Sequence, residues 1–213
     1  MLIEAMTKLS SLVIDYLSNP GWKVASMAMP EGDTIIGYLY CDYRDQKDQT
    51  ETNLLGSLLA QFLACQSMPK SIFEEVLDVC EAKQKKLEPL NLEKALEMIL
   101  LVVQSSRVFI CVDAVDELEQ GAQLSFLKSL EKIVHGARHT PRLFLTGRPH
   151  AQANVHRCLG TGDEASITVT ANEGDIRSFI AIRIGESDAE AMDDKLKEEI
   201  IETIVAKSGG MYV

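Results

Sequence analysis

The chain has 213 residues, of which 46% are apolar and 25% charged, a composition that fits one α/β domain or one domain with a small appendage. Its formal net charge of −11 argues against nucleic acid as a main partner, because phosphate binding needs clustered lysines and arginines. The apolar stretches are too short to span a membrane, and five scattered cysteines without a C-x-x-C pair indicate reduced thiols, so we expect a soluble, cytoplasmic protein.

The first hundred residues predict four helices and one strand. Apolar side chains recur every three or four residues in the helical segments, whereas β-branched and aromatic residues crowd the strand. Residues that can cap a helix precede three of the helices, at Thr50, Ser71 and Asn91, and Ser71 begins a capping box. The expected elements are helices over 7–18, 50–66, 71–86 and 91–104 and a strand over 34–43.

The second half of the chain alternates strands with helices. The apolar run RVFICVD at 107–113 is typical of a strand buried on both faces of a parallel sheet. RLFLTGR at 142–148 repeats this pattern, and SITVT at 166–170 repeats it more weakly. This alternation predicts an α/β fold with a mainly parallel sheet. The expected helices lie over 122–134, near 173–184 and over 192–207.

Acidic residues follow the strand at 107–113. Asp113 ends it, and Asp116 and Glu117 come shortly after. Open α/β folds bind ligands at the carboxyl edge of the sheet, and Mg²⁺ takes few protein carboxylates. One aspartate with a nearby acid that orients water is the Walker B pattern of nucleotide hydrolases. We therefore predict Asp113 as the metal ligand and Asp116 and Glu117 as catalytic. Alternatively, the two later acids only favour the dipole of a following helix.

The next predicted strand ends in Thr146, Gly147 and Arg148, at the same edge of the sheet. An arginine there would stabilise the charge that phosphoryl transfer spreads over the γ-phosphate. Taken alone, GRP would be a turn with a solvated arginine. Because it follows the Asp113 segment, we interpret Arg148 as a catalytic sensor of the γ-phosphate.

In their order and spacing these segments resemble the NACHT class of STAND nucleotidases, and more closely the nephrocystin 3-like N-terminal domain of fungal multidomain proteins. The resemblance implies a three-layer, P-loop NTPase-like fold with a mainly parallel sheet flanked by helices. It also implies a core over residues 1–170, followed at 171–213 by the start of a helical extension. It also implies Mg²⁺ and ATP or GTP as ligands, and a signalling switch between closed and open, self-associating states. The segments that carry it are IIGYLYCDYRDQKDQTETNLLGSLLAQFL, RVFICVDAVDEL, RLFLTGRP, NEGDIRSFI and AKSGGMYV.

The phosphate loop of that family, G-x-x-x-x-G-K-[ST], has no counterpart in this chain. Placed before the first helix, the motif puts its Ser/Thr on Thr7, its lysine on Met6 and its second glycine on Ala5. In the family, glycines let backbone N–H groups surround the phosphates, and the lysine neutralises the phosphate charge. Of these parts of the motif, this chain keeps only the Thr7 hydroxyl, which could bind magnesium. We therefore expect a fold that lacks the first, Walker A, strand, and little or no ATP hydrolysis.

Two alternatives remain open. In the first, the chain is a non-enzymatic regulatory module that binds other protein domains or itself. This alternative follows because a missing strand would expose a sheet edge or an apolar groove. Or it is a fragment of a complete signalling NTPase with a misplaced start, in which case a glycine-rich G-K-[ST] sequence would lie upstream. A zinc site at His135 and His139 is disfavoured by Gly136 and the loop setting.

Overall fold

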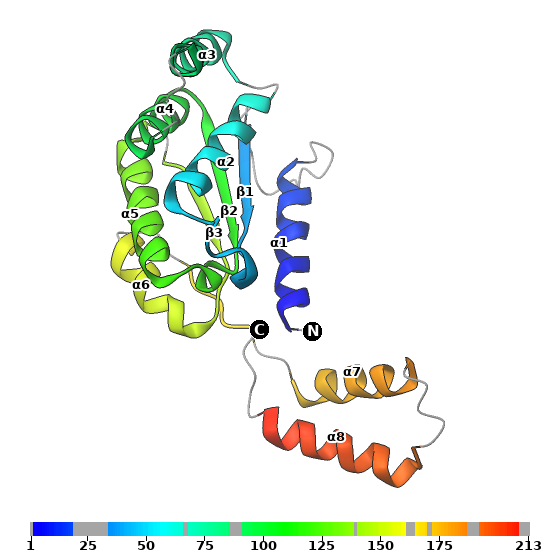
Figure 1. The fold of residues 1–213 in the computed structure, drawn as a ribbon. Helices are drawn as coiled ribbons and strands as arrows, with labels where there is room; N and C mark the ends of the chain where they lie inside the picture. The colour runs from blue at the N-terminus through cyan, green and yellow to red at the C-terminus, as the bar shows by residue number, and fades with distance from the viewer. Residues whose placement is uncertain are drawn as a thin grey trace. The chain divides into compact units, whose positions relative to one another are not determined.

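The computed structural model describes residues 2–18, 34–65, 68–85, 91–138, 140–160, 165–169, 172–186 and 192–208. These residues form two compact units, one essentially of residues Ile3–Glu164 and the other of Ala165–Val213 (Figure 1). The elements of the first unit are α1 (Leu2–Ser18), β1 (Thr34–Tyr40), the 3-10 turn η1 (Tyr43–Asp45), α2 (Glu51–Ala64), α3 (Lys70–Lys85), α4 (Leu92–Ser105), β2 (Arg107–Asp113), the 3-10 turn η2 (Val115–Glu117), α5 (Gln120–Gly136), β3 (Arg142–Leu145) and α6 (Pro149–Leu159). The second unit contains α7 (Glu173–Glu186) and α8 (Asp194–Ser208).

The three strands form one parallel sheet in the order β1-β2-β3. Tyr40 lies opposite Asp113, and Val112 lies opposite Leu145, so the carboxyl ends of all three strands meet at one edge. No described strand precedes α1. For the described residues, the predicted α/β fold, with a parallel sheet flanked by helices and without a first strand, is confirmed.

One face of the sheet carries the hydrophobic core. Alternate residues of β2, namely Val108, Ile110 and Val112, are fully buried on this face. Gly37 of β1, opposite Ile110, brings the sheet against α2, and α4 and α5 pack beside α2 (Figure 1). The largest fully buried side chains from these helices are Leu55, Leu58, Phe62, Met98, Ile99, Phe126, Leu127, Leu130 and Ile133.

The other face of the sheet carries α1, which Figure 1 shows on the side opposite α2, α4 and α5. The contact is largely polar. The hydroxyls of Ser11 and Tyr40 lie 3.1 Å apart, and Ser10 reaches Asp113. Ile14 is the one buried apolar side chain among the described side chains of α1. Hydrogen bonds therefore carry much of this contact.

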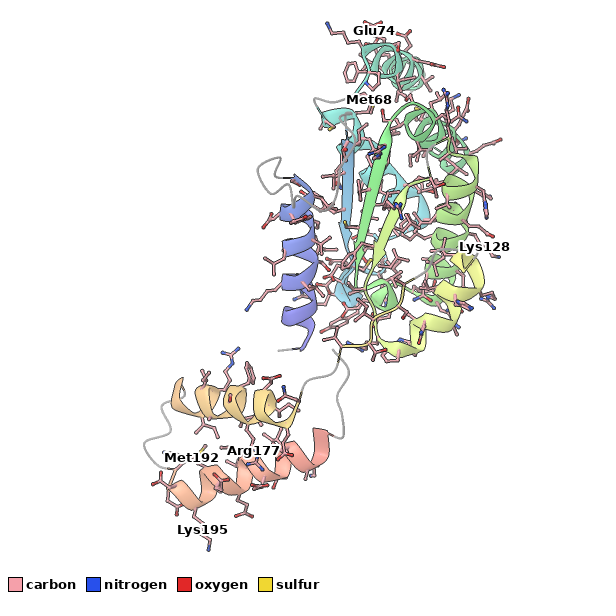
Figure 2. The ribbon with its side chains drawn as sticks, turned by 180° about the vertical axis from the view of Figure 1, so that it is seen from behind. Met68, Glu74, Lys128, Arg177, Met192 and Lys195 are labelled. Atoms are coloured by element: carbon pink, nitrogen blue, oxygen red, sulfur yellow. The ribbon has the colours of Figure 1, made fainter. Side chains whose placement is uncertain are left out.

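In the second unit an arginine joins α7 to α8. Arg177 of α7, labelled in Figure 2, contacts Glu173 on its own helix and Glu198 and Glu202 on α8, at 2.8–3.6 Å. Hydrogen bonds to Glu202 and then Glu173 raise the pKa of Arg177 above its usual value. Side chains cap both helices: Asn172 accepts from the Asp175 amide and Asp193 from the Leu196 amide.

Two predicted caps are confirmed and one is wrong. Thr50 and Asn91 each accept a backbone N–H of the first turn of α2 and α4. Ser71 does not cap α3, because that helix begins at Lys70 and the carbonyl of Pro69 accepts its first N–H groups.

In the part of the chain that is described, no helix is long and apolar enough to cross a membrane.

The first helix is longer than predicted. α1 begins at Leu2 instead of residue 7, so the segment IEAMT, where we expected the remnant of a phosphate loop, is helical. The N–H groups from Met6 onward consequently belong to the helical hydrogen-bond pattern.

The strand predicted over 166–170 is wrong for the described residues 165–169, which form neither strand nor helix. β-Branched residues favour a strand only where a neighbouring strand packs beside them, and no described strand pairs with this segment. Ile167 is 84% exposed. Residue 170 lies outside the described residues, as does His139 of the histidine pair.

Helix α6 was not predicted. Pro149 occupies its first position, where a missing N–H costs nothing, and the GRP segment hides this start because it reads as a turn. Ala151 and Cys158 are buried, and α6 packs on α5.

Gly37→Ala should destabilise the first unit by about 1–3 kcal/mol, because overpacking a core displaces its neighbours. A Cβ at Gly37 would lie 2.6 Å from the Phe62 ring and 2.9 Å from Leu58. The matched control is Gly56→Ala in α2, where a Cβ meets nothing within 4 Å and should stabilise the helix by about 0.5–1 kcal/mol. Urea unfolding of both variants measures the difference; equal effects would contradict the packing.

Candidate functional site

The carboxylate of Asp113 lies at the carboxyl edge of the sheet and is surrounded by hydroxyls. Asp113 is 4% exposed. Its Oδ1 accepts from the hydroxyls of Ser10 and Thr146, both at 2.6 Å, and its Oδ2 accepts from the Thr7 hydroxyl at 2.8 Å. A buried carboxylate costs free energy unless donors replace its water, and these three hydroxyls do so.

Two of these donors come from one face of α1. Thr7 and Ser10 are three residues apart, which places both side chains on the same side of a helix. Their partner is 106 and 103 residues away in the sequence, respectively.

The third donor, Thr146, directly follows β3. Its backbone N–H donates to the Val112 carbonyl and its own carbonyl accepts from Val115, both at 2.9 Å. The Thr146 hydroxyl accepts from the Ala114 N–H at 2.9 Å, so its proton points to Asp113. The Thr146 hydroxyl is therefore held both as an acceptor and as a donor.

Asp116 faces Arg148. Its side chain is 3% exposed, and it accepts from the backbone N–H of Arg148 at 3.0 Å. The guanidinium of Arg148 lies 3.5 Å from Asp116, and the His150 ring lies 3.9 Å from it. Gly147 permits this approach, since a Cβ there would lie 3.2 Å from the Asp116 carboxylate. Asp116 and Arg148, each predicted as a site residue, are thus in contact.

Glu117 lies between the loop that follows β1 and Arg148. Its carboxylate accepts from the Tyr43 N–H at 3.1 Å, and its backbone carbonyl accepts from the Gln46 side chain at 2.7 Å. The guanidinium of Arg148 is 3.7 Å from Glu117. The turn η2 that presents both acids begins after Ala114, whose φ of 54° and ψ of 48° are left-handed.

The edge of the sheet is electrically negative. Burial, and then the charges of the three nearby carboxylates, raise the pKa of the Cys41 thiol to about 12. Arg44 does not offset them, because its guanidinium is hydrogen-bonded to Asp42, whose pKa it lowers to about 2. Arg148, with a side chain 54% exposed, contacts two of these three carboxylates, those of Asp116 and Glu117. Such an edge suits a cation.

The oxygens around Asp113 fit magnesium, whereas the N-terminal segment does not fit phosphates. Mg²⁺ binds one or two carboxylates and fills its other positions with waters and phosphate oxygens. Asp113 and the Thr7 hydroxyl supply ligands of that kind. Within the described ranges no three His, Cys, Asp or Glu side chains gather as a metal cage. Ala5 and Met6, the positions at which the sequence comparison expects a glycine and a lysine of a phosphate cradle, lie in the first turns of α1.

All five predicted site residues lie at this edge of the sheet. Thr7 contacts Asp113, and Arg148 contacts both Asp116 and Glu117. The sequence reasoning missed Ser10, which has no motif, and the hydroxyl of Thr146. The place of Thr146 at the end of an apolar strand was the one available signal for it. The amide of Tyr43 and the side chain of Gln46, which hold Glu117, carry no sequence signal either.

Thr146→Val, which keeps the shape and removes the hydroxyl, should destabilise the chain by about 1.5–3 kcal/mol, since Asp113 loses a charge-assisted donor and the Ala114 N–H loses its acceptor. Thr146→Ser retains both bonds and should cost less. Urea unfolding near neutral pH measures both; a Val variant as stable as the Ser variant would contradict the role of the hydroxyl.

Comparison with known protein families matches residues 6–148 to the family described as nephrocystin 3, N-terminal. The matched region includes Thr7, β1, β2, η2 and β3 and ends at Arg148, so it contains all five predicted site residues together with Ser10 and Thr146. No curated protein matches the chain. Because the match covers more than half of the 213 residues, the chain belongs to the nephrocystin 3 N-terminal family.

Proposed function

We propose that this chain is a NACHT-type nucleotide switch domain in which the magnesium site is kept and the phosphate site is impaired. The observation that carries the proposal is the 2.8 Å hydrogen bond between Thr7 and Asp113, two segments 106 residues apart that meet at the carboxyl edge of the sheet. This pairs a hydroxyl at the start of a helix with a carboxylate at the end of a strand, both potential Mg²⁺ ligands.

The neighbouring residues support a role with nucleotides. In this proposal Arg148, half-exposed at the same edge, contacts the γ-phosphate, and Asp116 or Glu117 orients a water. Bound Mg²⁺ would offset phosphate charge. Glu117 is already oriented, because one of its carboxylate oxygens accepts from the Tyr43 amide and the other faces Arg148.

The impairment follows from the N-terminal residues. A phosphate cradle needs free backbone N–H groups and a positive charge. Ala5 and Met6 bring no charge, and the helical backbone from Leu2 uses the N–H groups from Met6 onward. ATP and GTP should therefore bind weakly and be hydrolysed slowly or not at all.

Restoring the missing residues tests the proposal. We expect wild-type chain to bind Mg·ATP and Mg·GTP more weakly than micromolar in titration calorimetry. The double variant Ala5→Gly, Met6→Lys should bind at least about tenfold more tightly, the effect of one charge-assisted hydrogen bond. The matched control, Ala5→Gly with Met6→Gln, has the same shape without the charge and should show no such gain.

Adding Asp113→Asn to the double variant should remove the gain. Micromolar binding by wild-type chain that is lost in Asp113→Asn would contradict the impairment. No gain in the lysine variant, together with no effect of Asp113→Asn, would contradict the nucleotide site itself.

A second candidate function is self-association as a regulatory module. The observation that favours it is the exposed aromatic pair on β1, Tyr38 and Tyr40, whose rings lie 5.9 Å apart on the sheet face that carries α1. Leu9 and Leu12 of α1 are also exposed. An exposed pair of aromatic side chains such as Tyr38 and Tyr40 is typical of interaction surfaces.

Light scattering after size exclusion, without nucleotide, tests this candidate. We expect a mass of two chains or more that falls to one chain in Tyr38→Lys. Phe73→Lys is the matched control, because Phe73 is a similarly exposed aromatic residue on α3. A single-chain mass for wild type at high concentration would reject self-association.

A further inference from the structure

Ser10 is a buried hydroxyl that no motif explains. It is 1% exposed, whereas Leu9 and Leu12, on other sides of α1, are exposed. A buried hydroxyl costs free energy unless it is hydrogen-bonded, and Ser10 donates to Oδ1 of Asp113 at 2.6 Å. The inward face of α1 thus places a donor where an apolar side chain would otherwise pack.

The donors are unevenly divided between the two oxygens of Asp113. Oδ1 accepts from both Ser10 and Thr146, whereas Thr7 is the one donor to Oδ2 among the described residues. A carboxylate has about four lone-pair sites, two on each oxygen. Oδ1 is therefore filled, and the remaining site is on Oδ2, beside the hydroxyl oxygen of Thr7.

We propose that Ser10 is a positioning residue that restricts Asp113 to binding a cation through one oxygen, and thereby favours Mg²⁺ over Ca²⁺. The inference rests on the proposed function, in which Asp113 is the metal ligand. Mg²⁺ takes oxygens in a strict octahedron at about 2.0–2.1 Å, whereas Ca²⁺ also accepts both oxygens of one carboxylate at about 2.3–2.6 Å. With Oδ1 occupied by Ser10 and Thr146, the two-oxygen mode is closed.

Ser10→Ala frees one lone pair on Oδ1. It should therefore raise the affinity for Ca²⁺ relative to that for Mg²⁺ by about tenfold, the effect of one hydrogen bond to a charged group. Ser11→Ala is the matched control on the same helix, because the Ser11 hydroxyl lies beside Tyr40 and not Asp113. Its ratio should equal that of wild type. Ser10→Cys keeps the volume with a weak donor and serves as the test variant if Ser10→Ala does not fold.

The measurement is made on the full chain, labelled with ¹⁵N, while MgCl₂ or CaCl₂ is added without nucleotide. The amide signals of Ala114 and Thr146 report binding, because the Ala114 N–H donates to the Thr146 hydroxyl and that hydroxyl donates to Asp113. A higher affinity for Ca²⁺ relative to Mg²⁺ in Ser10→Ala, with no such change in Ser11→Ala, supports the inference.

Two other outcomes separate this inference from the proposed function. If the Ser10 variant lowers Tm but leaves the cation ratio unchanged, while Asp113→Asn abolishes binding, Ser10 is structural only and the inference alone is overturned. If wild-type signals do not respond to either cation, or respond equally in Asp113→Asn, the metal assignment of the proposed function fails and the inference fails with it.

Discussion

The Asp113 carboxylate is almost fully buried, and a buried carboxylate must be surrounded by donors because it has lost its water. Where those donors come from determines how the first unit is assembled. Ser10 and Thr7 draw α1 onto the sheet, and Thr146 joins the end of β3 to the end of β2. Since Ile14 is the one buried apolar side chain among the described side chains of α1, this carboxylate is a main attachment of that helix.

The turn after Asp113 depends on the same residues. Ala114 adopts a left-handed conformation, which costs an L-residue about 1–2 kcal/mol. Its N–H and that of Val115 are both bonded to Thr146, and these bonds offset the strain. As a result the chain turns sharply enough to bury Asp116 and Glu117 against Arg148 and the loop after β1. The two acids are thereby oriented by the protein itself.

Local signals explain which parts of this arrangement could be predicted. The strand at 107–113 and the caps at Thr50 and Asn91 are set by neighbouring residues, and they lie where the sequence predicts them. The segment SITVT has the residues of a strand, but a strand also needs a partner, and no described strand supplies one. No local pattern indicates Ser10, because its role depends on contact with a residue 103 positions away in the sequence. Asp113, Thr7 and Arg148 were found through their order along the chain, not their contacts.

The two halves of the site differ in what else their residues do. The glycines and lysine of a phosphate loop serve the phosphates alone, and in the proposed function their positions fall on Ala5 and Met6, in a helical segment. Asp113 has a second task, because removing it would leave the hydroxyls of Ser10, Thr146 and Thr7 without their acceptor. Buried donors that lose a partner cost about 1–3 kcal/mol each, a large part of the stability of a domain. The fold therefore has a physical reason to keep this carboxylate that does not depend on phosphate binding, and with it the oxygens proposed as ligands for a cation.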